Sequence, residues 1–205
     1  MSATRMQAFV GPMFSSKTEA LHGQLRRQIH TRRIVVLFRP TADTRDQNNG
    51  TLSAHDGGSS FDPSKLPGKN YLEWVESSVD VLRRAHELGA NAVGIDEGQF
   101  FDGGLPAVML QLYREGVKVF YAGLDTDWQG KLFETTSNVM LCPEVNVHKM
   151  TAVCSNCGSE TATRSLKKDA ASADPSQRVD PGGKDKYEAA CLSCFSKAME
   201  NIKSG

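Results

Sequence analysis

The sequence has no excess of either charge, because its 205 residues contain 24 lysines and arginines and 24 aspartates and glutamates. A balanced chain creates no overall field that attracts nucleic acid or a membrane surface, and we expect neither partner. No apolar run approaches the length of a membrane-spanning helix, and residues 1–10 carry no secretion signal. We therefore expect a soluble, cytoplasmic protein that acts on a small molecule.

Cysteine is scarce as well, with five residues in the whole chain. Four of them form two Cys-x-x-Cys pairs, Cys154 with Cys157 and Cys191 with Cys194. In a reducing compartment this pattern is typical of a four-thiolate zinc site with a long loop between its halves. A redox-active pair is the alternative, but such a pair follows a strand and needs no second pair. We interpret Cys142 as a buried or free thiol.

The length allows one sizeable core and a small additional module. The composition changes near Met150, so we predict one domain over residues 1–142 and a zinc-binding domain over residues 143–205. Residues 167–185, between the cysteine pairs, are polar and contain Pro181, Gly182 and Gly183. We expect a mobile loop whose ends the metal holds together.

A phosphate-binding loop is indicated by the stretch Gly11-Pro-Met-Phe-Ser-Ser-Lys-Thr18. The motif requires a glycine, four residues, a small residue, then lysine and serine or threonine. Backbone N–H groups of such a loop surround a polyphosphate, the lysine neutralises its terminal phosphates, and the threonine hydroxyl binds Mg²⁺.

Ser16 is the imperfect position of this motif, because a second glycine is usual there. It leaves open the alternative of an ordinary turn between a strand and a helix. If the turn needs a positive φ at Ser16, the serine is strained by roughly 1–2 kcal/mol.

The apolar pattern around this loop predicts an α/β fold with a parallel sheet. Short apolar runs predict buried strands at residues 7–10, 32–38, 91–97 and 118–124. Three- and four-residue apolar spacing predicts helices at residues 19–30, 70–88 and 105–114, and residues 39–64 form a long loop.

Two adjacent acids, Asp96 and Glu97, end one predicted strand. In phosphate-loop proteins a neighbouring strand delivers an aspartate to the magnesium shell, and a following acid can act as general base. We assign these roles to Asp96 and Glu97, against the alternative of two surface acids. Beyond the next strand, Trp128 and Phe133 lie at the carboxyl edge of the sheet, where they either stack on a base or belong to the core.

Taken together, these motifs resemble the zinc-containing, cytosolic (type II) thymidine kinase family. The resemblance runs from about residue 6 to residue 195. The stretches that carry it are Gly11-Pro-Met-Phe-Ser-Ser-Lys-Thr18, Asp43-Thr-Arg45, Ser53-Ala-His-Asp-Gly57, Asp96-Glu-Gly-Gln-Phe-Phe101, Gly123-Leu-Asp-Thr-Asp-Trp-Gln-Gly130, both cysteine pairs, and Gly182-Gly-Lys-Asp-Lys-Tyr187.

The resemblance implies a P-loop parallel sheet with helices on both faces, followed by a small zinc-binding lasso domain that closes over the nucleoside. The implied reaction is ATP-dependent phosphorylation of the 5′-hydroxyl of thymidine or deoxyuridine, with Glu97 as the base. It also implies Mg²⁺, a structural Zn²⁺ on the four paired cysteines, a homotetramer, and feedback binding of dTTP.

The family's binding residues carry over position by position. Those implied around the ATP phosphates and Mg²⁺ are Gly11, Pro12, Met13, Phe14, Ser15, Ser16, Lys17, Thr18, Asp43, Arg45, Asp96 and Gln99, with Thr18 and Asp96 on the metal. Those implied around the nucleoside are Met13, Phe100, Leu124, Trp128, Phe133, Thr163, Val179, Gly182 and Tyr187.

The chain departs from the family pattern at Ser16, at Asp180-Pro181, at Leu192, and at Trp128, where phenylalanine is more usual. Such departures leave a catalytically impaired nucleoside-binding relative as an alternative, although Lys17, Asp96 and Glu97 are all present. A zinc-ribbon nucleic-acid adaptor on a P-loop ATPase is a second alternative. The neutral charge and the absence of a basic stripe in residues 141–205 count against it.

Overall fold

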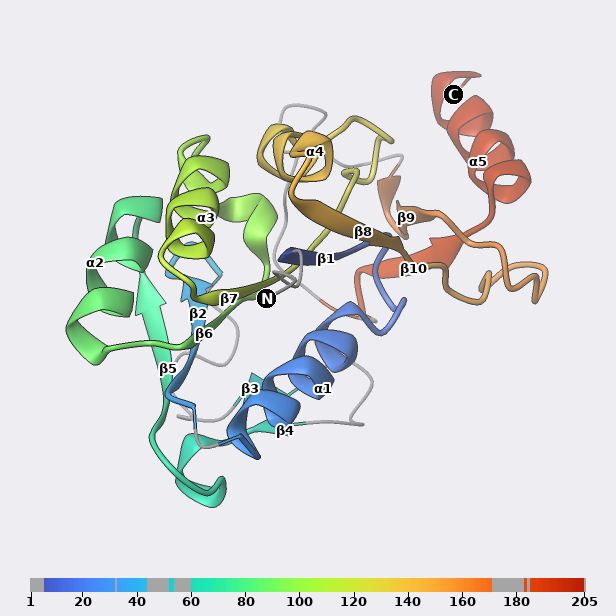
Figure 1. Ribbon diagram of the computed structural model, residues 1–205. Helices are drawn as coiled ribbons and strands as arrows, with labels where there is room; N and C mark the ends of the chain where they lie inside the picture. Colours follow the sequence, from blue (N-terminus) through green and yellow to red (C-terminus); the bar gives the residue numbers. More distant parts are fainter. Residues whose placement is uncertain are drawn as a thin grey trace.

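The computed structural model describes residues 6–31, 33–43, 52–53, 60–170, 183 and 185–204. Within these residues the main sheet has six strands, all parallel, in the order β5-β2-β6-β7-β1-β8 (Figure 1). Their bounds are β1 Met6–Val10, β2 Val35–Pro40, β5 Asn70–Val75, β6 Ala92–Ile95, β7 Lys118–Gly123 and β8 Val145–Lys149. The predicted α/β fold with a parallel sheet is confirmed.

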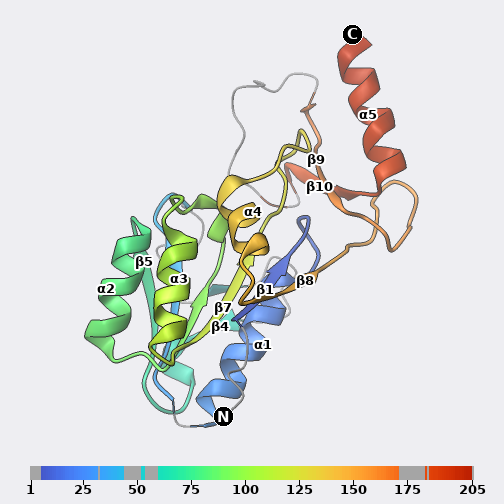
Figure 2. The same ribbon diagram turned by 45° about the horizontal axis from the view of Figure 1, so that its top comes forward.

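Helices cover both faces of this sheet, as Figures 1 and 2 show. On one face lies α1 (Lys17–Ile29), which buries Leu21, Leu25 and Ile29 against the strands. The other face is covered by α2 (Ser78–Leu88), α3 (Leu105–Arg114) and α4 (Glu134–Leu141). Because both faces are buried, the central strands read as continuous apolar runs in the sequence.

The helix predicted over residues 70–88 is wrong in its first part, where the chain forms the edge strand β5. Side chains of β5 alternate between the two cores: Tyr71 and Val75 pack toward α2, whereas Leu72 and Trp74 pack toward α1. Apolar residues recur at intervals of three and four across the boundary between β5 and α2, and this spacing is typical of a single helix. The helix starts only at Ser78, after the capping residue Ser77, whose side chain accepts a hydrogen bond from the backbone N–H of Asp80.

Several elements were not predicted. Besides α4 and β8, they include the two-residue strands β3 (Leu52–Ser53) and β4 (Ser60–Phe61), and the 3-10 helices η1 (Pro63–Lys65) and η2 (Gly98–Phe100).

Strand β8 pairs with β1 and belongs to the main sheet, although it follows the predicted domain boundary at residue 142. The division into two domains remains a prediction.

The chain after the sheet forms a small separate layer, called here the C-terminal module (residues 150–170 and 185–204). It contains the antiparallel strands β9 (Arg164–Lys167) and β10 (Tyr187–Ala190) and the helix α5 (Leu192–Ser204). Figure 2 shows the module beyond the β1 and β8 end of the sheet. Among the described residues, none of the helices combines the length and apolar character that a membrane crossing requires.

Candidate active site

The phosphate loop, residues 11–18, connects β1 to α1 at the carboxyl edge of the sheet. Gly11 has a φ of 155°, and a Cβ atom added there would lie 2.3 Å from the carbonyl oxygen of Met150. A side chain cannot occupy that space without moving the backbone of the segment that follows β8. Glycine is therefore required where the motif begins.

Two residues of this loop adopt the left-handed backbone conformation without being glycine. They are Phe14, with φ 63°, and Ser16, with φ 57°. Each such residue is strained by roughly 1–2 kcal/mol, because its Cβ atom crowds the following carbonyl. Ser16 precedes α1 and makes no side-chain capping hydrogen bond that would offset this strain.

We therefore expect Ser16→Gly to raise the free energy of unfolding by up to about 1 kcal/mol and to keep or increase activity. Ser77→Gly is the matched control, because Ser77 also caps a helix but has an extended backbone and a capping hydrogen bond. In that control the free energy of unfolding should fall by a few tenths of a kcal/mol, roughly the usual effect of replacing a serine cap by glycine. Denaturant unfolding measures both changes. A destabilised or strongly impaired Ser16→Gly protein would contradict the strain argument.

Lys17 and Thr18 open helix α1 and face different partners. The Lys17 Nζ atom donates to the carbonyl oxygen of Pro12 and lies 3.3 Å from the hydroxyl oxygen of Ser15, so the ammonium group lies over the loop. The Thr18 hydroxyl donates to a carboxylate oxygen of Asp96 at 3.1 Å. This hydrogen bond joins the first turn of α1 to the residue that follows β6.

Asp96 and Glu97 follow β6 in different environments. Burial raises the pKa of the Asp96 carboxyl to about 6, and the nearby Arg39 guanidinium opposes this shift. Glu97 has a left-handed backbone (φ 51°), and its side chain is 12% exposed. One carboxylate oxygen of Glu97 accepts a hydrogen bond from the Gln99 amide at 2.7 Å. Gln99 in turn accepts one from the backbone N–H of Leu124 at 2.9 Å, which fixes Glu97 relative to the end of β7.

Arg39, near the end of β2, is the central charged residue that sequence reasoning missed. Its side chain is 4% exposed and lies 3.0 Å from a carboxylate oxygen of Asp43, 3.5 Å from Asp96 and 3.6 Å from Glu97. The guanidinium carbon also lies 5.4 Å from the centre of the Trp74 ring. The sequence did contain a signal for this role of Arg39, because a charged residue inside the buried run Val-Val-Leu-Phe-Arg-Pro must have charged partners.

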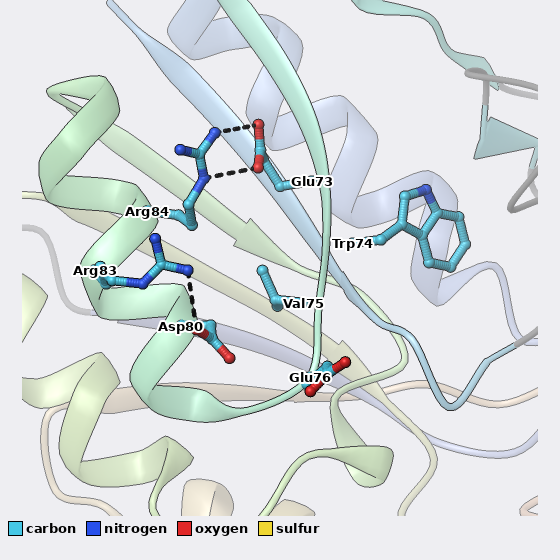
Figure 3. Close-up of a pocket in the computed structure, with 7 residues that line it drawn as sticks. All are labelled: Glu73, Trp74, Val75, Glu76, Asp80, Arg83 and Arg84. Carbon is cyan, nitrogen blue, oxygen red and sulfur yellow. Dashed lines mark hydrogen bonds and ion pairs between the residues drawn. The ribbon is translucent and has the colours of Figure 1, made fainter.

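A shallow polar depression lies on the α2 side of β5 (Figure 3). Its charges are paired locally: Arg84 bonds Glu73 at 2.9 and 3.0 Å, and Arg83 bonds Asp80 at 3.0 Å. Trp74 points away from these residues. The lining includes no residue of the phosphate loop or of β6, so we do not assign substrate binding to this depression.

The residues predicted around the nucleoside are partly brought together. Met13, Trp128 and Tyr187 share one buried cluster, and Leu124 packs against it. Phe100 and Phe133 form an edge-to-face pair with ring centres 6.5 Å apart. Thr163 is half-buried and bonds through its backbone N–H to the carbonyl oxygen of Ala190, at the start of β9.

The four paired cysteines converge in the C-terminal module. The Sγ atoms of Cys154, Cys157, Cys191 and Cys194 all lie within 4.8 Å of one another. Burial raises the pKa of the Cys154 thiol, but hydrogen bonds from backbone amides, chiefly that of Cys191, outweigh it and bring the pKa to about 6. Four thiols with one close to ionisation suit a tetrahedral zinc ion, and two separate redox pairs would not need to meet. Cys142 lies outside the cluster as a partly buried free thiol, as predicted.

Replacing one cluster thiol tests this assignment. We expect the purified protein to contain about one zinc ion per chain, and Cys191→Ser to lose it, because three thiolates bind zinc far more weakly than four. Cys142→Ser is the control and should keep its zinc. Elemental analysis of both proteins measures the difference. Equal zinc content in the two variants would exclude the cluster as the metal site.

Comparison with known proteins now decides the family. A family model described as "Thymidine kinase" matches residues 4–195. The chain belongs to the thymidine kinase family. It is 34% identical to a thymidine kinase of Bacteroides fragilis over 198 residues, which cover 96% of this chain and 89% of that protein. It is 35% identical to one of Bdellovibrio bacteriovorus over 201 residues (95% and 87%) and 32% identical to one of Deinococcus radiodurans over 192 residues (92% and 88%).

The resemblance stated from the motifs is thereby confirmed at the level of the thymidine kinase family. Three of the residues assigned by that resemblance, Arg45, Val179 and Gly182, lie outside the described residues, as does the departure at Asp180-Pro181. Leu192 is 60% exposed at the start of α5, which explains why this position accepts a change of residue type.

Proposed function

We propose that the chain transfers the γ-phosphoryl group of ATP to the 5′-hydroxyl of thymidine, and also to that of deoxyuridine. The observation that carries the proposal is the meeting of Thr18, Asp96 and Glu97 at one edge of the sheet, beside Lys17. Phosphoryl transfer requires mainly that two reactants are positioned and that their charge is neutralised. A loop, a cation and one base supply both requirements.

The phosphate loop and Lys17 hold the triphosphate. N–H groups of the loop and the positive end of α1 surround the phosphate oxygens, and Lys17 moves from the Pro12 carbonyl to the terminal phosphates. Thr18 and Asp96 present two oxygen atoms 3.1 Å apart, which suits Mg²⁺, a cation that prefers oxygen ligands. When bound, Mg²⁺ would offset the negative charge of the phosphates.

Glu97 serves as the general base. The 5′-oxygen of the nucleoside forms a new bond to the γ-phosphorus while the bond from that phosphorus to the β,γ-bridging oxygen breaks, so ADP leaves. The proton of the 5′-hydroxyl passes to the Glu97 carboxylate. The hydrogen bond from Gln99 and the charge of Arg39 hold this carboxylate in one orientation, which favours transfer from a fixed geometry.

The cluster of Met13, Trp128 and Tyr187 suits a pyrimidine base, because it brings two aromatic rings and an apolar side chain of the phosphate loop together. We assign Leu124, Phe100, Phe133 and Thr163 to the border of this pocket. On the family resemblance alone, we also propose that the segment between the cysteine pairs covers the base and excludes water, with Val179 and Gly182 as contacts, and that Arg45 binds the phosphates.

We further propose a structural zinc ion, a homotetramer, feedback binding of dTTP and a cytoplasmic location. The thiol cluster supports the zinc, and a site of reduced thiols suits a reducing compartment. The tetramer and the dTTP site rest on the family resemblance alone.

No observation favours the catalytically impaired alternative, because Lys17, Asp96 and Glu97 are all present and Thr18, the residue after Lys17, bonds to Asp96. The deciding experiment is a nucleoside screen with labelled ATP and Mg²⁺, in which we expect phosphate transfer to thymidine and deoxyuridine and little to purine nucleosides. Thymidine binding without any transfer at saturating ATP would favour the impaired alternative instead.

A further inference from the structure

A hydrogen bond connects the phosphate loop to the C-terminal module. The backbone N–H of Met13 donates to the hydroxyl oxygen of Ser165, on β9, at 2.9 Å. Met13 is 9% exposed and Ser165 is 2% exposed, so water does not compete for this bond. Neither the motif nor the family resemblance assigned a role to Ser165.

Ser165 is in turn tied closely to the cysteine cluster. It lies opposite Ala189 in the pairing of β9 with β10, and β10 ends directly before Cys191. The carbonyl oxygen of Ala189 also accepts the N–H of Ser155, beside Cys154. The position of Ser165 is therefore set by β10, the strand that leads directly into the cluster thiol of Cys191.

Two more contacts connect the module with the loop. Phe14 packs against the apolar residues around the cysteines, a group that includes Cys154 and Cys191. The carbonyl oxygen of Met150 occupies the space beside Gly11 where a side chain would otherwise lie. The module thus contacts the loop at its first, third and fourth residues.

The loop needs this outside support because its own conformation is strained. Phe14 and Ser16 both have a left-handed backbone, and such residues persist only where the surroundings hold them. The Ser165 hydrogen bond fixes the residue directly before Phe14. Loss of this bond would let the loop relax toward a shape that presents its remaining N–H groups less well to phosphates.

We propose that Ser165 is a positioning residue for ATP and that the zinc-bound module controls ATP affinity through it. This inference rests on the proposed function, because it assumes that residues 11–18 bind the phosphates of ATP. It assigns the module a role at the donor site, in addition to its proposed role as a cover for the nucleoside.

The test compares Ser165→Ala with wild type by calorimetric titration with ATP and Mg²⁺ and by steady-state kinetics. We expect the Kd and KM for ATP to rise about fivefold, roughly the effect of one buried hydrogen bond, while kcat at saturating ATP changes less than about twofold. Ser165→Thr keeps the acceptor oxygen in a strand-compatible residue and should retain an ATP affinity near that of wild type. Ser159→Ala is the matched control: it removes another hydroxyl of the module, whose hydrogen bond of 2.8 Å goes to Thr161 and not to the loop.

Removal of zinc by a chelator provides the second measurement. It should weaken ATP binding in wild type by at least the factor seen for Ser165→Ala, and weaken it less in the variant, because both changes break the same connection. Thermal melting of each protein verifies that the variants are folded.

The outcomes separate the two proposals. If wild type binds no ATP, the proposed function fails and the inference fails with it. If wild type binds ATP and Ser165→Ala binds it equally well, or if zinc removal leaves ATP affinity unchanged, the inference alone is overturned.

Discussion

Glu97→Gln should lower kcat for thymidine phosphorylation by about a thousandfold, within the range that general bases contribute. The amide has nearly the same shape as the carboxylate but cannot accept the proton of the 5′-hydroxyl. Since Glu97 lies at the end of β6 and outside the base cluster, the Kd for thymidine should stay within about threefold of wild type. Steady-state assays and calorimetric titration measure the two quantities separately.

Glu76→Gln is the control for this prediction, because Glu76 is exposed and lies after β5, away from the phosphate loop. It should retain wild-type turnover. If Glu97→Gln retains more than a tenth of wild-type activity, Glu97 is not the base, and another acid of the site must take the proton.

Arg39→Met should destabilise the fold by about 3 kcal/mol, because it leaves three carboxylates close together without their shared cation. Methionine fills most of the volume of the arginine side chain, so a cavity contributes little to the loss. Arg39→Lys keeps the charge but not the planar group that reaches several acids, and an intermediate loss is expected. Urea unfolding of the three proteins measures the series.

Arg83→Met is the matched control. Arg83 has carboxylates at similar distances, 3.0 Å to Asp80 and 2.9 Å to Glu87, but its side chain is 54% exposed. Exposed ion pairs contribute less than about 1 kcal/mol, so this variant should be nearly as stable as wild type. If Arg39→Met and Arg83→Met lower the free energy of unfolding equally, burial does not determine how much the Arg39 ion pairs stabilise the fold.

The parts of the site with a local pattern were predictable. The spacing from Gly11 to Thr18 depends on neighbouring backbone atoms, so it located the loop between β1 and α1 from the sequence, and phosphate binding there stays a prediction. Both cysteine pairs likewise predicted that the four thiols cluster. The buried central strands were predictable because a strand covered on both faces leaves a continuous apolar run.

The edge strand β5 could not be predicted from the spacing of apolar residues. Its side chains alternate between two cores, so both faces contain apolar residues, and the run joined smoothly to the apolar spacing of α2. Only the pairing of β5 with β2 distinguishes a strand from the first turns of a helix there. Pairing partners lie far apart in the chain and leave no local pattern.

By itself, the sequence determined the class of fold, predicted a phosphate loop and the roles of the two acids after β6, and singled out the four thiols that cluster. The tertiary structure alone decided that Arg39 joins three acids, that Gln99 orients Glu97, and that Ser165 reaches the amide of Met13. The physical reason is that motifs record what adjacent residues must do for one ligand. Ion pairs and hydrogen bonds between distant strands depend on how the chain brings those strands together.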